Sequence, residues 1–201
     1  LTTDVTDEGG ETRTGRRSFT LGFVSVRAQI DSAVSFFRAG AGGFFRILRT
    51  DLNGTPRPGK GSWRITALRQ PDTALLPADQ PQSSKEGEYL TPGDRLRPRW
   101  DPAYPPDAIM RSWADGEVLA KGEVAHKEDG GATVTLPDLH DGAYRLNYET
   151  TDDFGASSTA AKEFVVAGVE TRLALPGLLL AESSSVLTGG TARFIAHSGI
   201  P

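Results

Sequence analysis

The chain has 201 residues, and glycine and proline account for 23 and 13 of them, so it is rich in turn-forming residues. It contains no cysteine, which excludes disulfides, thiolate nucleophiles and cysteine-ligated zinc. Its formal net charge of −4 gives no electrostatic basis for binding nucleic acid.

The first part of the chain predicts β-strands separated by tight turns. Residues 24–30 alternate apolar and polar side chains, as expected of a half-buried strand. Residues 44–50 form a second candidate strand, which is closed by an Asn53-Gly54 turn. Alternation over 63–68 predicts a third strand, with Trp63 as a core anchor.

Residues 71–106 interrupt this pattern with many prolines and a polar run, and they predict a long loop or an irregular edge. Strand patterning then resumes, with turns at Asp115-Gly116 and 128–131. The candidate strands are 108–113, 118–124, 133–136, 144–148 and 162–166. Short strands at this spacing predict an all-β fold, an antiparallel β-sandwich like those of immunoglobulin and fibronectin type III domains.

Two further segments bear on this fold. The spacing in Asp141-Gly142-Ala143-Tyr144 is typical of a tyrosine corner, in which the phenol hydroxyl bonds to backbone a few residues upstream. The apolar stretch 173–181 is far shorter than the ~20 residues that cross a bilayer, and it predicts a buried strand.

The beginning of the chain resembles its end. The run from Asp7 to Phe19 resembles the run from Asp152 to Phe164, at an offset of 145 residues. Gly40, which precedes an apolar run, corresponds to Gly189 at an offset of 149 residues. A repeat of domain size indicates tandem modules. We therefore expect residues 1–21 to end one domain, 22–167 to form a complete sandwich, and 168–201 to begin a third.

No motif in the chain predicts catalysis or metal binding. The three histidines lack the spacing of a shared metal site, and Ser198 lacks the strand-to-helix context of a hydrolase nucleophile. The Asp-x-x-Gly sequences at Asp7, Asp51 and Asp152 predict turns, because each supplies too few oxygens for calcium. The histidines are His126, His140 and His197.

Two segments look like anion-binding sites, but their sequence context predicts ordinary turn and strand structure instead. Residues 54–60 have the glycine-to-Gly-Lys spacing of a phosphate loop, but Gly61 stands where Ser or Thr would hold magnesium, and a strand follows instead of a helix. Arg95, Arg97 and Arg99 alternate with apolar residues, as on the solvated face of an extended segment. We predict no catalytic, cofactor-binding or metal-binding residues, and no cofactor.

Several runs resemble consecutive macroglobulin-like domains of bacterial alpha-2-macroglobulins, and in their order the resemblance extends over nearly the whole chain. The runs are 5–19, 49–54, 136–146 and 189–198. The resemblance implies a periplasmic or extracellular endopeptidase inhibitor, whose domains surround a bait segment and trap the protease that cleaves it. This segment would be scaffold: not an enzyme, not inhibitory alone, and without direct membrane contact. Its partners would be adjacent domains and, for the whole protein, the target protease.

That family often uses a Cys-x-Glu-Gln thioester, and this chain departs from the pattern because it has no cysteine. An alternative of a different class is an adhesin or carbohydrate-binding array of immunoglobulin-like modules. For that function, Trp100, Tyr104 and Trp113 would have to form an exposed aromatic platform.

Overall fold

The structure is a computed structural model that describes residues 1–20, 22–75 and 105–200. Nearly all of its regular structure is β-strand, and these ranges contain one helix, α1 (Pro106–Ser112). The predicted all-β sandwich is confirmed. Within the described ranges, no helix has the length and apolarity needed to cross a membrane.

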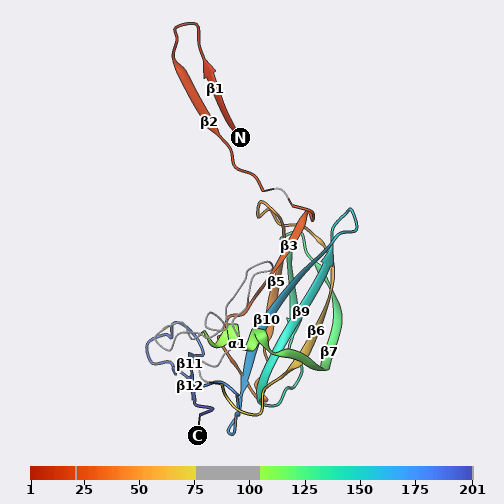
Figure 1. The fold of residues 1–201 in the computed structure, drawn as a ribbon, viewed down its shortest axis with the longest axis vertical. Coiled ribbons are helices and arrows are strands. Elements are labelled where there is room, and N and C mark those ends of the chain that lie inside the picture. Colours follow the sequence, from red (N-terminus) through yellow and green to blue (C-terminus); the bar gives the residue numbers. More distant parts are fainter. Residues whose placement is uncertain (21, 76–104, 201) are drawn as a thin grey trace, which may run out of the picture.

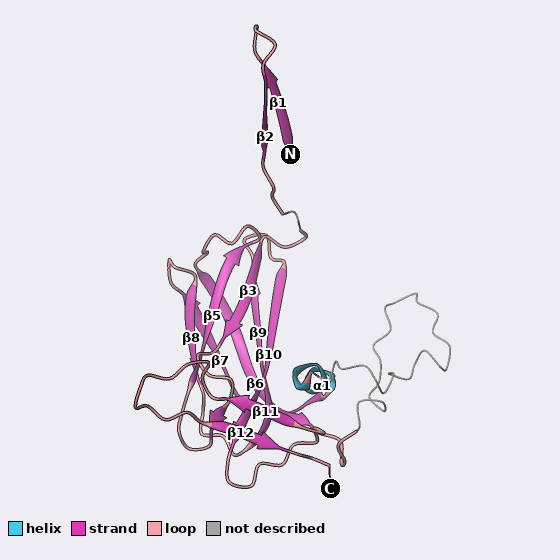
Figure 2. Cartoon of the chain, turned by 90° about the vertical axis from the view of Figure 1, so that its left-hand side faces the viewer, coloured by secondary structure: helices cyan, strands magenta, loops and turns pink. Residues whose placement is uncertain are grey.

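Two sheets face each other in the central part of the chain (Figures 1 and 2). The larger sheet has the order β4 (Phe37–Arg38), β10 (Ser157–Ala167), β9 (Gly142–Thr151), β6 (Gly59–Arg69) and β7 (Ala114–His126). The smaller has the order β3 (Val26–Asp31), β5 (Phe44–Asp51) and β8 (Gly131–Thr135). All neighbouring strands are antiparallel except β4 and β10, which are parallel.

The main core fills the space between these sheets. Phe45 and Ile47 of the smaller sheet are fully buried, as are Ile65 and Leu146 of the larger one. The alternation read from the sequence places these side chains on the two inner faces, where removing apolar surface from water stabilises the sandwich. Trp63 is half-buried and packs against this core.

A second core lies on the opposite, outer face of the larger sheet. Helix α1 and the hairpin of β11 (Leu178–Ala181) and β12 (Phe194–His197) pack over one end of that face. Met110 from the helix and Leu175 and Leu178 from the hairpin region join Val165 of β10. The outer face is therefore covered at this end, and rows of polar side chains occupy it farther along the strands.

Arg145 of β9 holds helix α1 on the sheet. Its Nη2 donates to the carbonyl oxygens of Met110, Arg111 and Trp113, at the end of the helix where carbonyls lack partners. Its Nε donates to Glu163 at 2.7 Å and its Nη1 to Asp115 at 2.5 Å. This largely buried cation fixes the helix through both charge and hydrogen bonds.

Three local predictions are corrected. The predicted strand 108–113 is helix α1, which begins with Pro106 at its first turn, a position where proline costs no hydrogen bond. The predicted turn at Asp115-Gly116 lies inside β7, which runs unbroken over Ala114–His126. The predicted strand 173–181 is strand only over Leu178–Ala181, although Leu173 and Leu175 are buried as expected.

Other local predictions are confirmed. Gly54 N–H donates to the Asp51 carbonyl in the turn after β5, and Gly130 N–H donates to the Lys127 carbonyl in the turn after β7. Most of the predicted proline-rich loop, residues 76–104, lies outside the described residues.

The N-terminal hairpin stands apart from the sandwich. Strands β1 (Thr2–Thr6) and β2 (Thr12–Arg16) pair with each other, and all ten of their residues are exposed. In Figure 1 the hairpin extends from one end of the sandwich, while β11 and β12 lie near the other end.

Candidate interaction surfaces

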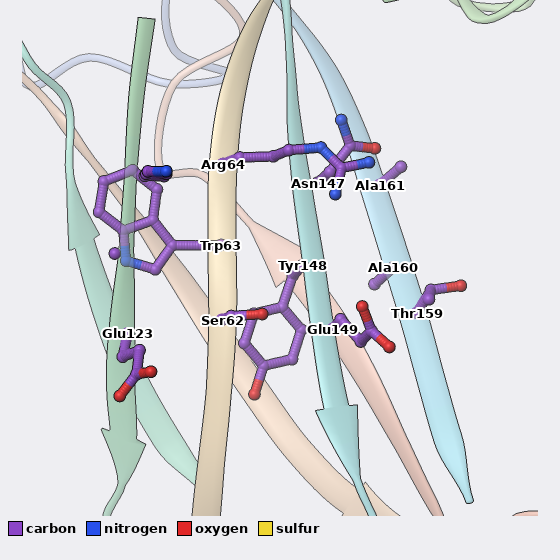
Figure 3. A pocket seen from close by; sticks show the side chains of 12 residues that line it. Ser62, Trp63, Arg64, Glu123, Asn147, Tyr148, Glu149, Thr159, Ala160 and Ala161 are labelled. Atoms are coloured by element: carbon purple, nitrogen blue, oxygen red, sulfur yellow. The ribbon is translucent and has the colours of Figure 1, made fainter. Parts of the chain in front are cut away.

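A shallow hollow of about 650 Å³ crosses the outer face of the larger sheet (Figure 3). Its lining comes from four adjacent strands, β7, β6, β9 and β10, and includes no residue of the smaller sheet. Strand register places two rows of side chains across it. One row is Glu123, Ser62, Glu149 and Thr159; the other is Lys121, Arg64, Asn147 and Ala161.

The two rows carry opposite charges. Glu123 and Glu149 flank Ser62 in the first row, whereas Lys121 and Arg64 are neighbours in the second. The hollow is thus a mixed-charge face of the larger sheet.

A buried polar network lies inside the sandwich, around His126. Its Nδ1 donates to the Gly130 carbonyl at 2.7 Å, so the ring is the tautomer whose Nε2 accepts from the Tyr148 hydroxyl at 2.5 Å. Burial lowers the pKa of His126, and the nearby Arg49 guanidinium adds to this effect. Burial also raises the pKa of Tyr148. Both groups are therefore neutral near pH 7 and serve as a hydrogen-bonded pair.

Arg49 completes the network from β5. Its Nε donates to Thr150 Oγ1 at 3.0 Å, and its Nη atoms donate to the carbonyl oxygens of Pro58 and Thr151 at 2.6 and 2.9 Å. Pro58 immediately precedes β6, and Thr151 is the last residue of β9. The guanidinium therefore joins β5 of the smaller sheet to the end of β9 and the start of β6 in the larger sheet.

The three Asp-x-x-Gly sequences form the same turn, as predicted. In each, one carboxylate oxygen accepts from the backbone N–H groups two and four residues later. The glycine three residues after the aspartate has φ between 82° and 91°, a region that favours glycine. The aspartates are Asp7, Asp51 and Asp152.

Asp152 also ties the turn to the smaller sheet. Its second oxygen accepts from the backbone N–H and hydroxyl of Ser25, at 2.8 and 3.0 Å. The Ser25 backbone donor is the main reason why the pKa of Asp152 is lowered to about 2. These carboxylates organise backbone, and no group of three or more metal-ligating side chains occurs among the described residues.

The structure does not bring the three histidines together. His126 is buried between the sheets, His140 is exposed, and His197 Nε2 lies 2.8 Å from the Leu173 carbonyl in the C-terminal segment. The His140 carbonyl accepts from the Tyr144 hydroxyl at 2.8 Å, which confirms the tyrosine corner. Burial is the main cause of the raised pKa of Tyr144.

Trp113 does not contribute to the exposed aromatic platform that the adhesin alternative requires. Trp113 is buried in the second core beside Met110, so it offers no face to a ligand. Trp100 and Tyr104 lie outside the described residues, as do Arg95, Arg97 and Arg99.

The sequence repeat is preserved in strand register. Thr6 pairs with Thr12 in the β1–β2 hairpin, and Thr151 pairs with Ser157 in β9–β10, each partner shifted by 145 residues. All five pairs of β1–β2 follow this rule. The first hairpin is therefore a structural copy of the tip of β9–β10, including its Asp turn.

The second repeat is preserved in the same way. Leu178 pairs with His197 in β11–β12, as Gln29 pairs with Leu48 in β3–β5, each partner shifted by 149 residues. The intervening turns also match, because Ala41 N–H donates to the Arg38 carbonyl and Gly190 N–H to the Leu187 carbonyl. The last hairpin is a counterpart of β3–β5.

These correspondences identify surfaces that the sequence reasoning missed. Core residues of the central sandwich correspond to exposed apolar residues in the terminal hairpins: Leu146 to Leu1, Phe164 to Phe19, Ile30 to Leu179, Phe37 to Val186 and Phe45 to Phe194. Shifting the core positions of the central sandwich by the two offsets, 145 and 149 residues, would have identified these surfaces from the sequence. Both hairpins thus expose the faces that a sandwich buries.

No family model matches the chain. No curated protein matches it either. Among solved structures, it is similar to dimeric latent PorU from Porphyromonas gingivalis, at 13% identity and a TM-score of 0.40. That match covers 82% of this chain but only 15% of the PorU chain.

Proposed function

We propose that this chain is a scaffold segment of a tandem array of β-sandwich domains. Residues 1–21 would end one domain, 22–167 would be a complete domain, and 168–201 would begin the next. The observation that carries the proposal is the repeat in register: both terminal hairpins copy hairpins of the central sandwich, pair for pair. Register is set by the sequence pattern, so matching registers support tandem copies of one module.

The exposed apolar faces support the same proposal. Leu1, Phe19, Leu179 and Phe194 occupy core positions of the module yet lie in solvent. Large exposed apolar residues that share a face mark a contact surface. In an array, the remaining strands of each neighbouring domain would cover these faces.

We further propose that the parent array is an alpha-2-macroglobulin-like endopeptidase inhibitor of the periplasm or extracellular space. Support comes from the order of the resembling runs, two of which are structural devices here: the Asp51 turn and the Tyr144 corner. Short connections between domains would transmit a shape change along the array after bait cleavage. In this role the chain itself is neither catalytic nor inhibitory.

The test uses the reading frame that flanks this chain. Its translation should show further copies of the module and an irregular bait segment. The corresponding long chain, once cleaved by a protease, should block that protease's action on a large protein but spare its action on a short peptide. Residues 1–201 alone should block neither. A flanking frame without further modules would contradict the array, and a long chain that leaves protein hydrolysis untouched would contradict the trap.

A further inference from the structure

Strand β7 forms an open edge of the larger sheet. It pairs with β6 on one side, and no other strand of the described residues pairs with its second side. A row of its backbone N–H and C=O groups therefore faces outward without a ladder partner among these strands. We infer that the chain forms a two-fold symmetric dimer, in which β7 of one copy pairs antiparallel with β7 of a second copy, centred on Gly122.

This edge belongs to the central sandwich, so its pairing does not depend on the proposed array. In Figure 1, β7 is the outermost strand along one side of the sandwich. The hairpin β1–β2 extends from one end, and β11–β12 lies near the other. Neighbouring domains of an array would continue from those two ends, and the side edge would stay accessible.

The part of β7 beside the hollow is regular enough to accept another strand. From Ala120 to His126 it follows β6 without a shift in register, whereas the register shifts closer to its start. Lys121 and Glu123 are exposed and border the hollow on the outer face. Val124 packs against the main core on the inner face. Residues 120–124 thus offer a straight edge with alternating side chains.

Charge selects the register of this pairing. A two-fold axis at Gly122 places Lys121 of each copy directly opposite Glu123 of the other, which gives two pairs of opposite charge. An axis at 121 would place lysine opposite lysine, and an axis at 123 would place glutamate opposite glutamate. Like charges that face each other directly destabilise a sheet, so both alternatives are disfavoured. Within the described part of the chain, neither side chain is engaged in an ion pair.

The charged rows of the hollow continue across the same axis. Glu123 lies at the β7 border of the first row, as Figure 3 shows. In the dimer this row meets the second row of the other copy, which begins at Lys121 and Arg64. The outer face is therefore complementary to itself, as a two-fold interface requires. The two five-stranded sheets would become one continuous sheet.

The inner face also accepts a second copy at this position. Gly122 lies opposite Gly122, and Ala120 lies opposite Val124, so no bulky side chain stands on the axis. The space beside Gly122 is already filled, because a Cβ there would lie 3.0 Å from the Trp63 ring. Ala120 and Val124 are half-buried, and the pairing would remove more of their apolar surface from water.

Sedimentation velocity of residues 1–201 tests the dimer with two charge reversals. Lys121→Glu and Glu123→Lys each place like charges opposite each other, so each variant alone should stay monomeric where the unaltered chain dimerises. An equimolar mixture should dimerise again, because the first variant carries two carboxylates at these positions and the second carries two ammonium groups. Lys162→Glu is the matched control, since Lys162 is exposed on β10, away from β7. It should dimerise like the unaltered chain.

Disulfide cross-linking tests the register in a chain without background thiols. A mixture of Lys121→Cys and Glu123→Cys chains should form a disulfide between unlike chains more readily than either variant alone forms one. The reason is that only the unlike positions lie directly opposite each other. Each mixed dimer also keeps one intact pair of Lys121 and Glu123.

The inference is overturned if the unaltered chain stays monomeric up to about 1 mM. It is also overturned if the single charge reversals associate as the unaltered chain does, because the association would then use another surface, such as the terminal hairpins. Equal cross-linking of the cysteine variants alone and in mixture would overturn the register centred on Gly122. The flanking reading frame, which tests the array, has no part in these outcomes, so the two proposals fail separately.

Discussion

Several buried polar residues of this chain connect its strands and turns through hydrogen bonds. Arg49 joins strand ends through carbonyl and hydroxyl oxygens, and His126 joins the turn at Gly130 to Tyr148. A buried polar group that loses its hydrogen-bond partner lowers the free energy of unfolding. A change of protonation state in one member of the network therefore destabilises its partners as well. His126 is the member whose charge changes nearest to neutral pH.

The first prediction is that His126 makes the sandwich less stable below neutral pH. Because its folded pKa is lowered, the unfolded chain binds more protons as pH falls through about 6.5, and the free energy of unfolding decreases there. His126→Phe should unfold more readily at pH 7.5 but lose less stability between pH 7.5 and 5.5. Urea denaturation at both pH values measures this. His140→Gln, at an exposed site, should retain the full pH dependence; an unchanged pH dependence in His126→Phe would refute the assignment.

At the scale of elements, the β11–β12 hairpin has two unlike faces. One face buries Leu178 and Ile195 in the second core, against helix α1 and the sheet. The other exposes Leu179 and Phe194. Strand alternation therefore separates a face that stabilises this chain from a face available to a partner.

The second prediction compares two neighbouring leucines. Leu178 is 5% exposed and Leu179 is 73% exposed. Leu178→Ala should lower the free energy of unfolding by about 2–5 kcal/mol, because it leaves a cavity in the second core. Leu179→Ala should stay within about 0.5 kcal/mol, as expected for an exposed site. Thermal and urea unfolding of both variants, at a concentration where the chain is monomeric, give the comparison; equal losses would show that the hairpin does not pack as described.

At the scale of the whole molecule, the N-terminal hairpin and the sandwich are nearly independent. The contact between them is carried by a few residues, among them Thr20, whose N–H donates to Asn53 Oδ1 at 3.2 Å. The C-terminal segment, in contrast, shares a core with the larger sheet. The C-terminal hairpin therefore contributes to the stability of the central sandwich, whereas the N-terminal hairpin does not.

The third prediction concerns deletions at the two ends. Removing residues 1–18 should leave the melting temperature of the monomer within about 2 °C, since no core residue is lost. Removing residues 174–201 should lower it much more, because Leu175, Leu178 and Ile195 leave the second core. Differential scanning calorimetry of both shortened chains decides the matter. A large loss from the first deletion would mean that the hairpin supports the sandwich.

Much of the fold could be predicted from local chemistry. Asp turns, the turn after β7 and the Tyr144 corner involve groups a few residues apart, so sequence spacing specifies their geometry. The candidate surfaces were harder to find. Leu1 and Phe194 look ordinary in sequence, and their importance depends on the partner strands that their counterparts have in the sandwich.

The sequence by itself determined the all-β class, most strands, most turns and the repeat, because alternation, glycine φ preference and side chain-to-backbone bonds act over short distances. Only the tertiary structure decided that 106–112 is a helix. Its apolar Ile109 and Met110 are buried against the sheet, and Arg145, distant in sequence, donates hydrogen bonds to the carbonyl oxygens at its C-terminal end. Tertiary packing likewise buried Trp113 and left one apolar face of each terminal hairpin in solvent. Burial depends on which elements meet, and residues far apart in the chain set that outcome.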